Sequence, residues 1–108
     1  MRFRAFDVSL QLVRSLRNVV EVIARHDAGL ADQVRRAAAS APLNLSEGWR
    51  RVGKDRHHHF RVAAGSTDEG VAALRVAEAW GWVDAADIDA PLALADSVLA
   101  MCWRMTHR

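Results

Sequence analysis

Apolar side chains recur at steps of three and four residues along almost the whole chain, and this spacing constrains the fold more than any other feature. The first such stretch runs from about residue 6 to residue 26, with charged residues between its apolar members, which are Phe6, Leu10, Val13, Leu16, Val20 and Ile23. No segment alternates apolar and polar residues between turn signals, as a half-buried strand would. The sequence therefore predicts an all-α protein.

Turn residues divide the periodic sequence into four predicted helices, at about residues 6–26, 30–49, 54–82 and 88–107. Gly29 is expected to end the first helix in the left-handed conformation. Pro42 lies inside the second helix, where the loss of a backbone hydrogen bond predicts a kink, and Pro91 is expected in the first turn of the last helix. A chain of 108 residues has room for one core. We therefore predict a single domain over residues 1–108, an up-down antiparallel four-helix bundle.

Cysteine content and hydropathy bear on the compartment. Cys102 is the only cysteine, which excludes an internal disulfide and a zinc site built from several thiolates. The first residues lack the apolar core of a signal peptide, and no apolar run reaches the roughly 18 residues of a membrane span. We expect a cytoplasmic protein that does not contact a membrane.

Positive charge is concentrated in one quarter of the chain. The net charge is only +2, but residues 35–61 hold seven basic residues and two acidic ones, a net charge of +5, whereas the remainder has a net charge of −3. Such asymmetry attracts polyanions. The basic residues of this quarter are predicted to contact nucleic-acid phosphates; they are Arg35, Arg36, Arg50, Arg51, Lys54, Arg56 and Arg61.

Polar residues three and four apart share a face of the second and third predicted helices. A solvated face is one interpretation, but small residues and a proline lie beside them, which favours a hydrogen-bonded seam between the two helices. Its predicted members are Ser40, Pro42, Asn44, Glu47, Gly48, Gly65, Ser66 and Glu69. A glycine costs about 1 kcal/mol inside a helix, and we expect the close approach of a neighbouring helix to offset that cost at Gly65 and Gly70.

The last predicted helix is apolar on two stripes, whereas a helix of a small monomeric bundle normally buries one. The second stripe is predicted to pack against another subunit, and together with a nearby tryptophan it consists of Leu94, Val98, Met101, Trp103 and Met105. Wide contact within a single bundle is the alternative.

Residues for catalysis or for binding a cofactor are not evident. The consecutive side chains of His57, His58 and His59 point about 100° apart on a helix, so they cannot bind one metal ion together. No Glu-x-x-His pair and no glycine-rich phosphate loop occurs, and Cys102 lies on an apolar stripe that is typical of a structural thiol. We expect a protein that is not an enzyme and has no metal or cofactor.

Two segments together resemble a known family. Residues 33–49 read QVRRAAASAPLNLSEGW, and Phe60 and the sequence AAGSTDE at residues 63–69 follow. They are similar to the four-helix-bundle proteins encoded in intervening sequences of bacterial 23S rRNA genes, a family that includes the accessory variability determinant of diversity-generating retroelements. The likeness covers essentially the whole chain, and the three elements Arg-Arg-Ala, Ser-x-Pro-x-Asn-x-x-Glu-Gly and Gly-Ser-x-x-Glu are specific in combination. The departures from the family pattern are conservative: the family usually has other small or aliphatic residues at the positions of Ala41, Leu43 and Leu45.

The resemblance implies a homopentameric barrel with a basic surface or channel, and retroelement members that bind nucleic acid and a reverse transcriptase. Our leading hypothesis is a non-catalytic, oligomeric protein that binds RNA or DNA, most readily structured RNA, through phosphates. Base-specific recognition is not predicted, because no aromatic platform apart from Trp49 accompanies the charges. The alternative is a scaffold or adaptor that binds a protein partner, such as a reverse transcriptase, through its apolar stripe and tryptophans.

Overall fold

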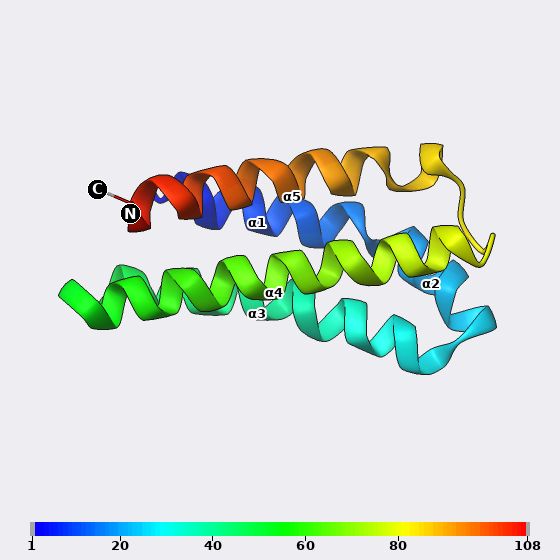
Figure 1. The fold of residues 1–108 in the computed structure, drawn as a ribbon, viewed down its shortest axis with the longest axis horizontal. Helices are drawn as coiled ribbons and strands as arrows, with labels where there is room; N and C mark the ends of the chain where they lie inside the picture. The colour runs from blue at the N-terminus through cyan, green and yellow to red at the C-terminus, as the bar shows by residue number, and fades with distance from the viewer. Residues whose placement is uncertain (1, 108) are drawn as a thin grey trace.

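The computed structural model describes residues 2–107, and within them it contains five helices and no strand, which confirms the predicted all-α class. Their bounds are α1 Arg4–Ser15, α2 Arg17–His26, α3 Ala28–Trp49, α4 Gly53–Ala79 and α5 Ala85–Thr106. Helices α1 and α2 run one after the other along the long axis, α3 returns, α4 runs forward again and α5 returns beside it (Figure 1). Among residues 2–107, no helix combines the length and the hydropathy needed to cross a bilayer.

The predicted first helix is divided in two at Leu16. The Leu16 amide bonds to the carbonyl of Val13 at 3.1 Å, a tighter turn than the α-helix has. Just before it, the hydroxyl of Ser15 donates to the carbonyl of Leu12 at 2.7 Å and competes with the backbone for that acceptor. The expectation of one continuous helix was wrong because this local bond leaves no mark in the apolar spacing.

Three boundaries are set by residues other than those we expected. Gly29 lies inside α3 and has no positive φ; the boundary is instead made by Asp27, whose Oδ1 accepts the Leu30 amide at 3.0 Å. Helix α4 ends at residue 79, earlier than predicted, because Gly81 adopts a φ of 79° and its amide bonds to the Glu78 carbonyl at 2.9 Å. Helix α5 begins at Ala85, directly after its N-cap residue Asp84, so Pro91 lies well inside the helix rather than in its first turn.

The core follows the predicted apolar faces. One cluster surrounds Ile23, Val34 and Ile88 at one half of the molecule, and a second surrounds Leu45 and Phe60 at the other. Helix α3 is unbroken across Pro42, which is buried, and it changes direction along its length (Figure 1). The predicted kink at Pro42 stays a prediction.

Candidate nucleic-acid interface

The α3–α4 connection carries four of the predicted phosphate-binding residues. Helix α3 ends at Trp49, and Gly53, with a φ of 59°, lets the chain reverse into α4. Arg50, Arg51 and Lys54 are all exposed here. Three cationic side chains therefore project from one short turn.

Two acidic residues accompany these cations. Arg51 bridges Glu47, at 3.2 Å, and Asp55, at 3.3 Å, while Arg50 lies 3.5 Å from Glu47. The hydrogen bond from Arg51 lowers the pKa of the Glu47 carboxyl, opposed by some desolvation and helped by the charge of Arg50. Ion pairs between exposed side chains are weak, so a phosphate can replace the carboxylate at small cost.

Arg56, the fourth of these residues, makes its contacts within the chain. Its Nε donates to the carbonyl of Gly48 at 3.2 Å and its Nη2 to the carbonyl of Trp49 at 2.8 Å, while the guanidinium lies 5.9 Å from the Trp49 ring centroid. These bonds satisfy carbonyls that the end of a helix leaves free. Arg56 therefore closes the end of α3 and positions Trp49.

The remaining predicted cations do not join the connection. Arg35 pairs with Asp32 at 2.9 Å, and Arg36 lines a separate groove between α3 and α4. At a rise of 1.5 Å per residue, Arg36 and Arg50 are about 21 Å apart along α3. Arg61 is exposed two turns into α4. The seven residues thus form no single surface, because a helix separates residues that are close in sequence by about 1.5 Å for each position along its axis.

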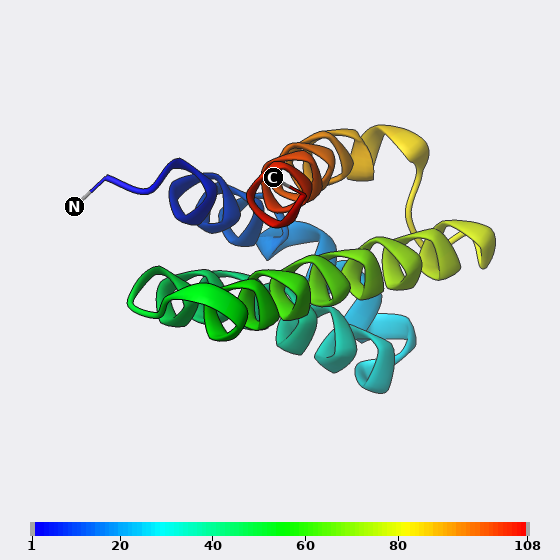
Figure 2. The same cartoon turned by 60° about the vertical axis from the view of Figure 1, so that its left-hand side comes forward.

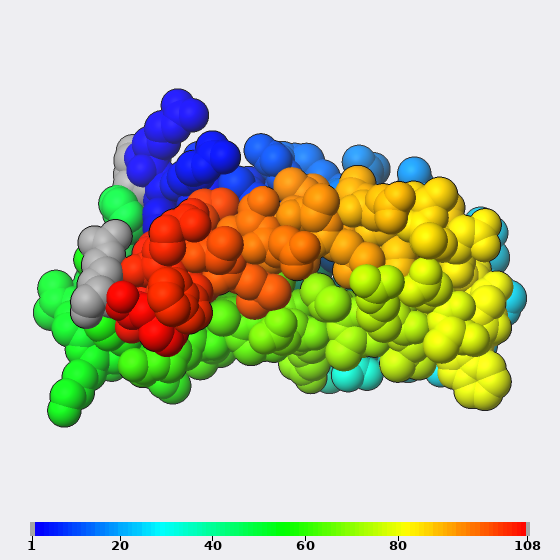
Figure 3. Space-filling model, turned by 45° about the horizontal axis from the view of Figure 1, so that its top comes forward, coloured from blue at the N-terminus to red at the C-terminus, as the bar shows by residue number. Residues whose placement is uncertain are grey.

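Both chain termini lie beside the α3–α4 connection and add cations that sequence reasoning missed. The blue N-terminal, green middle and red C-terminal segments meet at the left end of the molecule (Figure 3), and Figure 2 shows the same end from another side. Arg4 and Arg104 line one shallow groove there. We call this region the basic end; its cationic members are Arg4, Arg50, Arg51, Lys54 and Arg104.

Aromatic rings lie among these cations. Phe3 stacks on Trp49 with ring centroids 4.3 Å apart, and Trp103 stacks on His107 at 4.3 Å with planes 9° apart. Trp49 is 38% exposed and Trp103 is 60% exposed. The predicted antiparallel order of the helices could have indicated this grouping. It places the start of the first helix and the end of the last helix beside the α3–α4 connection.

The predicted seam is present at three of its residues. The hydroxyls of Ser40 and Ser66 lie 2.7 Å apart across α3 and α4, and the Asn44 amide donates to the Ser40 carbonyl at 2.9 Å and hydroxyl at 3.1 Å. A fourth member was missed: His59 Nδ1 lies 3.0 Å from Asn44 Oδ1. The sequence signal for it was the triple histidine, one member of which faces α3.

The two seam glycines differ. A Cβ on Gly48 would lie 2.7 Å from Phe60 Cε1, so the glycine allows the close approach of α3 and α4. A Cβ on Gly65 would meet no atom within 4 Å, so the close approach expected there was wrong: Gly65 is on the outer side of α4. Glu47 faces the cations of the basic end, and Glu69 lines the groove that contains Arg36.

The second apolar stripe of α5 is largely used inside the chain. Val98 is 0% exposed in the core and is not a surface residue, contrary to its predicted role. Leu94, Met101 and Met105 are half-buried and pack against the same core, so only Trp103 is mostly exposed. Wide contact within the bundle, the alternative interpretation, accounts for most of the stripe, because α5 packs on both α1 and α4.

Reactive groups are sparse in the described part of the chain. Burial raises the pKa of the Cys102 thiol to about 11, so the thiol is protonated and a poor nucleophile near neutral pH. Among residues 2–107, no three His, Cys, Asp or Glu side chains lie close enough together to hold a metal ion.

The other end of the molecule has the opposite character. The rings of His26 and Trp82 stack at 5.3 Å, and those of Trp82 and Trp80 at 5.7 Å. Trp80 is 68% exposed. The exposed carboxylates of Asp84 and Asp87 begin α5 beside them. We call this region the acidic end.

The chain is thus an all-helical bundle with exposed cations and tryptophans at one end and carboxylates with stacked rings at the other. It belongs to the family of the 23S rRNA-intervening sequence protein, whose pattern matches residues 2–104. This membership confirms the resemblance seen in the sequence.

A solved structure shares the fold. It is a protein of unknown function from the S23 ribosomal protein family of Bacteroides thetaiotaomicron, and the two superpose with a TM-score of 0.86 over 96% of this chain and 99% of that one. Their sequences are 12% identical, so the likeness shows the fold alone. No protein of curated function matches the chain significantly.

Proposed function

We propose that the chain is a non-catalytic protein that binds RNA through its basic end. The observation that carries the proposal is the grouping of cations from three distant segments around two exposed tryptophan rings. Cations bind phosphates by releasing counterions, and exposed rings stack on unpaired bases. The family name, which refers to 23S rRNA, agrees with RNA as the polyanion.

The salt dependence of binding tests this proposal. Five phosphate contacts per subunit, one for each cation of the basic end, predict a loss of about 100-fold in affinity for single-stranded RNA between 50 and 200 mM salt. The double variant Arg50→Glu, Arg51→Glu reverses two charges and removes two phosphate contacts. Both its affinity for RNA and the salt dependence of that affinity should therefore fall. Fluorescence anisotropy with a labelled RNA measures both quantities.

A matched control separates the basic end from net charge. Reversal of Arg14→Glu with Arg25→Glu changes the net charge by the same amount at exposed positions on α1 and α2. We expect this variant to bind RNA nearly as the unaltered chain does. Equal losses in the two double variants, or an affinity that ignores salt, would refute binding at the basic end.

We further propose that the chain acts as a homo-oligomer, with five copies in a ring as the family resemblance implies. Repetition of the basic end around a ring would raise the avidity for a long polyanion. Sedimentation equilibrium tests this, and the expected mass is that of five 12.0 kDa chains. A monomer at all concentrations would refute it.

A second candidate function rests on the acidic end. The carboxylates of this end repel phosphates, and the three stacked rings beside them suit contact with a protein surface. An adaptor that binds a protein partner, such as a reverse transcriptase, would use this end. A pull-down with and without nuclease distinguishes the two functions. Partners that survive nuclease and are lost from Trp80→Ala favour the adaptor; partners that nuclease removes favour RNA binding.

A further inference from the structure

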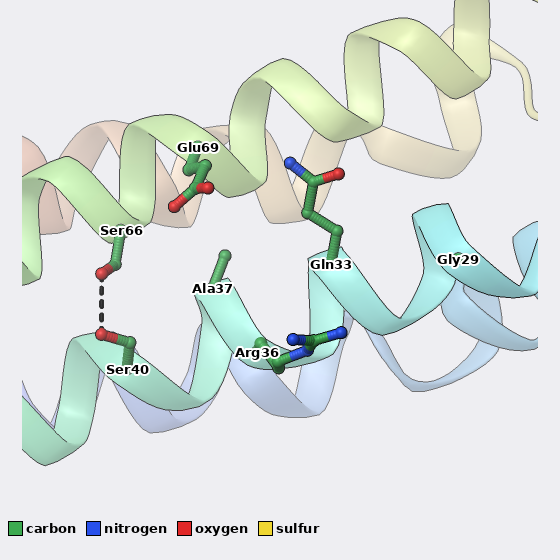
Figure 4. A pocket seen from close by; sticks show the side chains of 7 residues that line it. All are labelled: Gly29, Gln33, Arg36, Ala37, Ser40, Ser66 and Glu69. Carbon is green, nitrogen blue, oxygen red and sulfur yellow. Dashed lines mark hydrogen bonds between the residues drawn. The ribbon is translucent and has the colours of Figure 1, made fainter.

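A polar groove opens between α3 and α4, away from the basic end. Its volume is about 400 Å³, within the range of small-molecule sites. Gln33 points from α3 toward α4, and Glu69 points from α4 toward α3 (Figure 4). Arg36 lies along α3 at the edge of the groove, and the hydrogen bond between Ser40 and Ser66 closes one end.

Small residues make room for this groove. Ala37 lies at its floor, where a Cβ on Gly70 of the facing helix would come within 3.7 Å of the Ala37 Cβ. Gly29 contributes no side chain at the far end. The two helices are therefore close at the floor, while long polar side chains form the walls.

The charged groups of the walls have no partners in the described part of the chain. Arg36 and Glu69 form neither an ion pair nor a hydrogen bond with any of residues 2–107, and neither does the Gln33 amide. Arg35, the neighbour of Arg36, is by contrast paired with Asp32 at 2.9 Å. The groove thus holds a donor and an acceptor of opposite charge on facing helices.

We propose that this groove binds a guanine base, an inference that rests on the proposed RNA binding. The Glu69 carboxylate accepts from guanine N1–H and the N2 amino group, and the Arg36 guanidinium donates to O6 and N7. Guanine alone among the RNA bases has two adjacent donors on its Watson–Crick edge, which match the two oxygens of a carboxylate. Gln33 and the two serines supply further polar contacts.

The position of the groove suits a strand held at the basic end. Arg36 is twelve residues from Gly48, about 18 Å along α3. An RNA strand bound at the α3–α4 connection therefore reaches the groove along the side of the molecule where these helices meet. Base selection here adds to the phosphate contacts, which carry no sequence information.

Titrations of the whole chain with mononucleotides test the proposal. We expect GMP to bind about tenfold more tightly than AMP, the discrimination of one good bidentate contact. IMP, which lacks the N2 amino group, is expected to bind more weakly than GMP. Chemical-shift changes at residues 33, 36 and 69 would place the base in the groove.

Oligonucleotides distinguish a base within RNA from a free nucleotide. The pentanucleotide UUGUU should bind more tightly than UUUUU if the base belongs to a strand, whereas a preference confined to GMP points to a free nucleotide. Either preference supports the guanine site. Equal binding of GMP and AMP, together with equal binding of the two pentanucleotides, overturns it.

One substitution and a neighbouring control complete the test. Glu69→Gln replaces one acceptor by a donor and is expected to abolish the guanine preference, while Asp68→Asn, exposed and outside the groove, retains it. Neither should alter the salt slope of RNA binding, which reports on the basic end. A preserved preference in Glu69→Gln refutes the guanine site alone; loss of the salt slope in the unaltered chain refutes RNA binding.

Discussion

Gly48→Ala is expected to destabilise the chain, although alanine is the better helix former. The added Cβ would lie 2.7 Å from Cε1 and 2.9 Å from Cδ1 of Phe60, and 3.1 Å from the Cβ of His59. Phe60 is 3% exposed and packs against Phe3 at a centroid distance of 5.9 Å, so its ring has little room to move. Overpacking of this kind costs about 1–3 kcal/mol.

Helix propensity offsets part of that cost. Glycine to alanine gains about 1 kcal/mol in a helix interior, but Gly48 is one residue from the end of α3, where the gain is smaller. We therefore expect a net loss of about 1–2 kcal/mol. For a domain of this size, that corresponds to a decrease of roughly 4–10 °C in Tm.

Gly65→Ala is the matched control, because it makes the same chemical change where no atom lies within 4 Å of the new Cβ. At this position only the higher helix propensity of alanine acts, so the free energy of unfolding should rise by about 1 kcal/mol. Urea unfolding at equal protein concentration measures both variants, since self-association would shift either midpoint. The reasoning fails if Gly48→Ala is as stable as Gly65→Ala.

Three further predictions concern the seam, a helix cap and the buried thiol. Asn44→Leu leaves His59 Nδ1 without its acceptor, so thermal unfolding should show a loss of about 1–3 kcal/mol, and a gain would contradict the seam. Asp27→Ala removes the acceptor of the Leu30 amide and should cost about 1 kcal/mol in urea unfolding, whereas Asp27→Asn should cost little. Burial raises the pKa of Cys102 from 9.0 to about 11, so the folded state holds this proton more tightly. Stability should fall as pH rises between these values, and Cys102→Ala should flatten that slope.

Apolar spacing predicted much of the fold because burial in a helix requires a repeat of three to four residues. It placed Ile23, Val34, Leu45 and Phe60 on faces that are buried in the structure. It did not predict the break at Leu16, since the hydrogen bonds that make a tight turn do not change which residues are apolar.

The candidate site was harder to predict, because it depends on which segments meet at an end of the molecule. Charge counted along the chain grouped Arg35 and Arg36 with Arg50, although helix geometry separates them. It also omitted Arg4 and Arg104, which the antiparallel arrangement brings to the same end. The commitment of Arg56 to carbonyl oxygens depends on atomic positions that no spacing reveals.

The hydrogen bonds of Asn44 determine where neutral His59 carries its proton. The Asn44 amide nitrogen is committed to Ser40, so its oxygen faces His59 and requires the imidazole to donate from Nδ1. The lone pair of the neutral ring is therefore on Nε2, the nitrogen that takes no part in the bond to α3. The contact between α3 and α4 thus selects one of the two neutral tautomers of His59, the one that carries its proton on Nδ1.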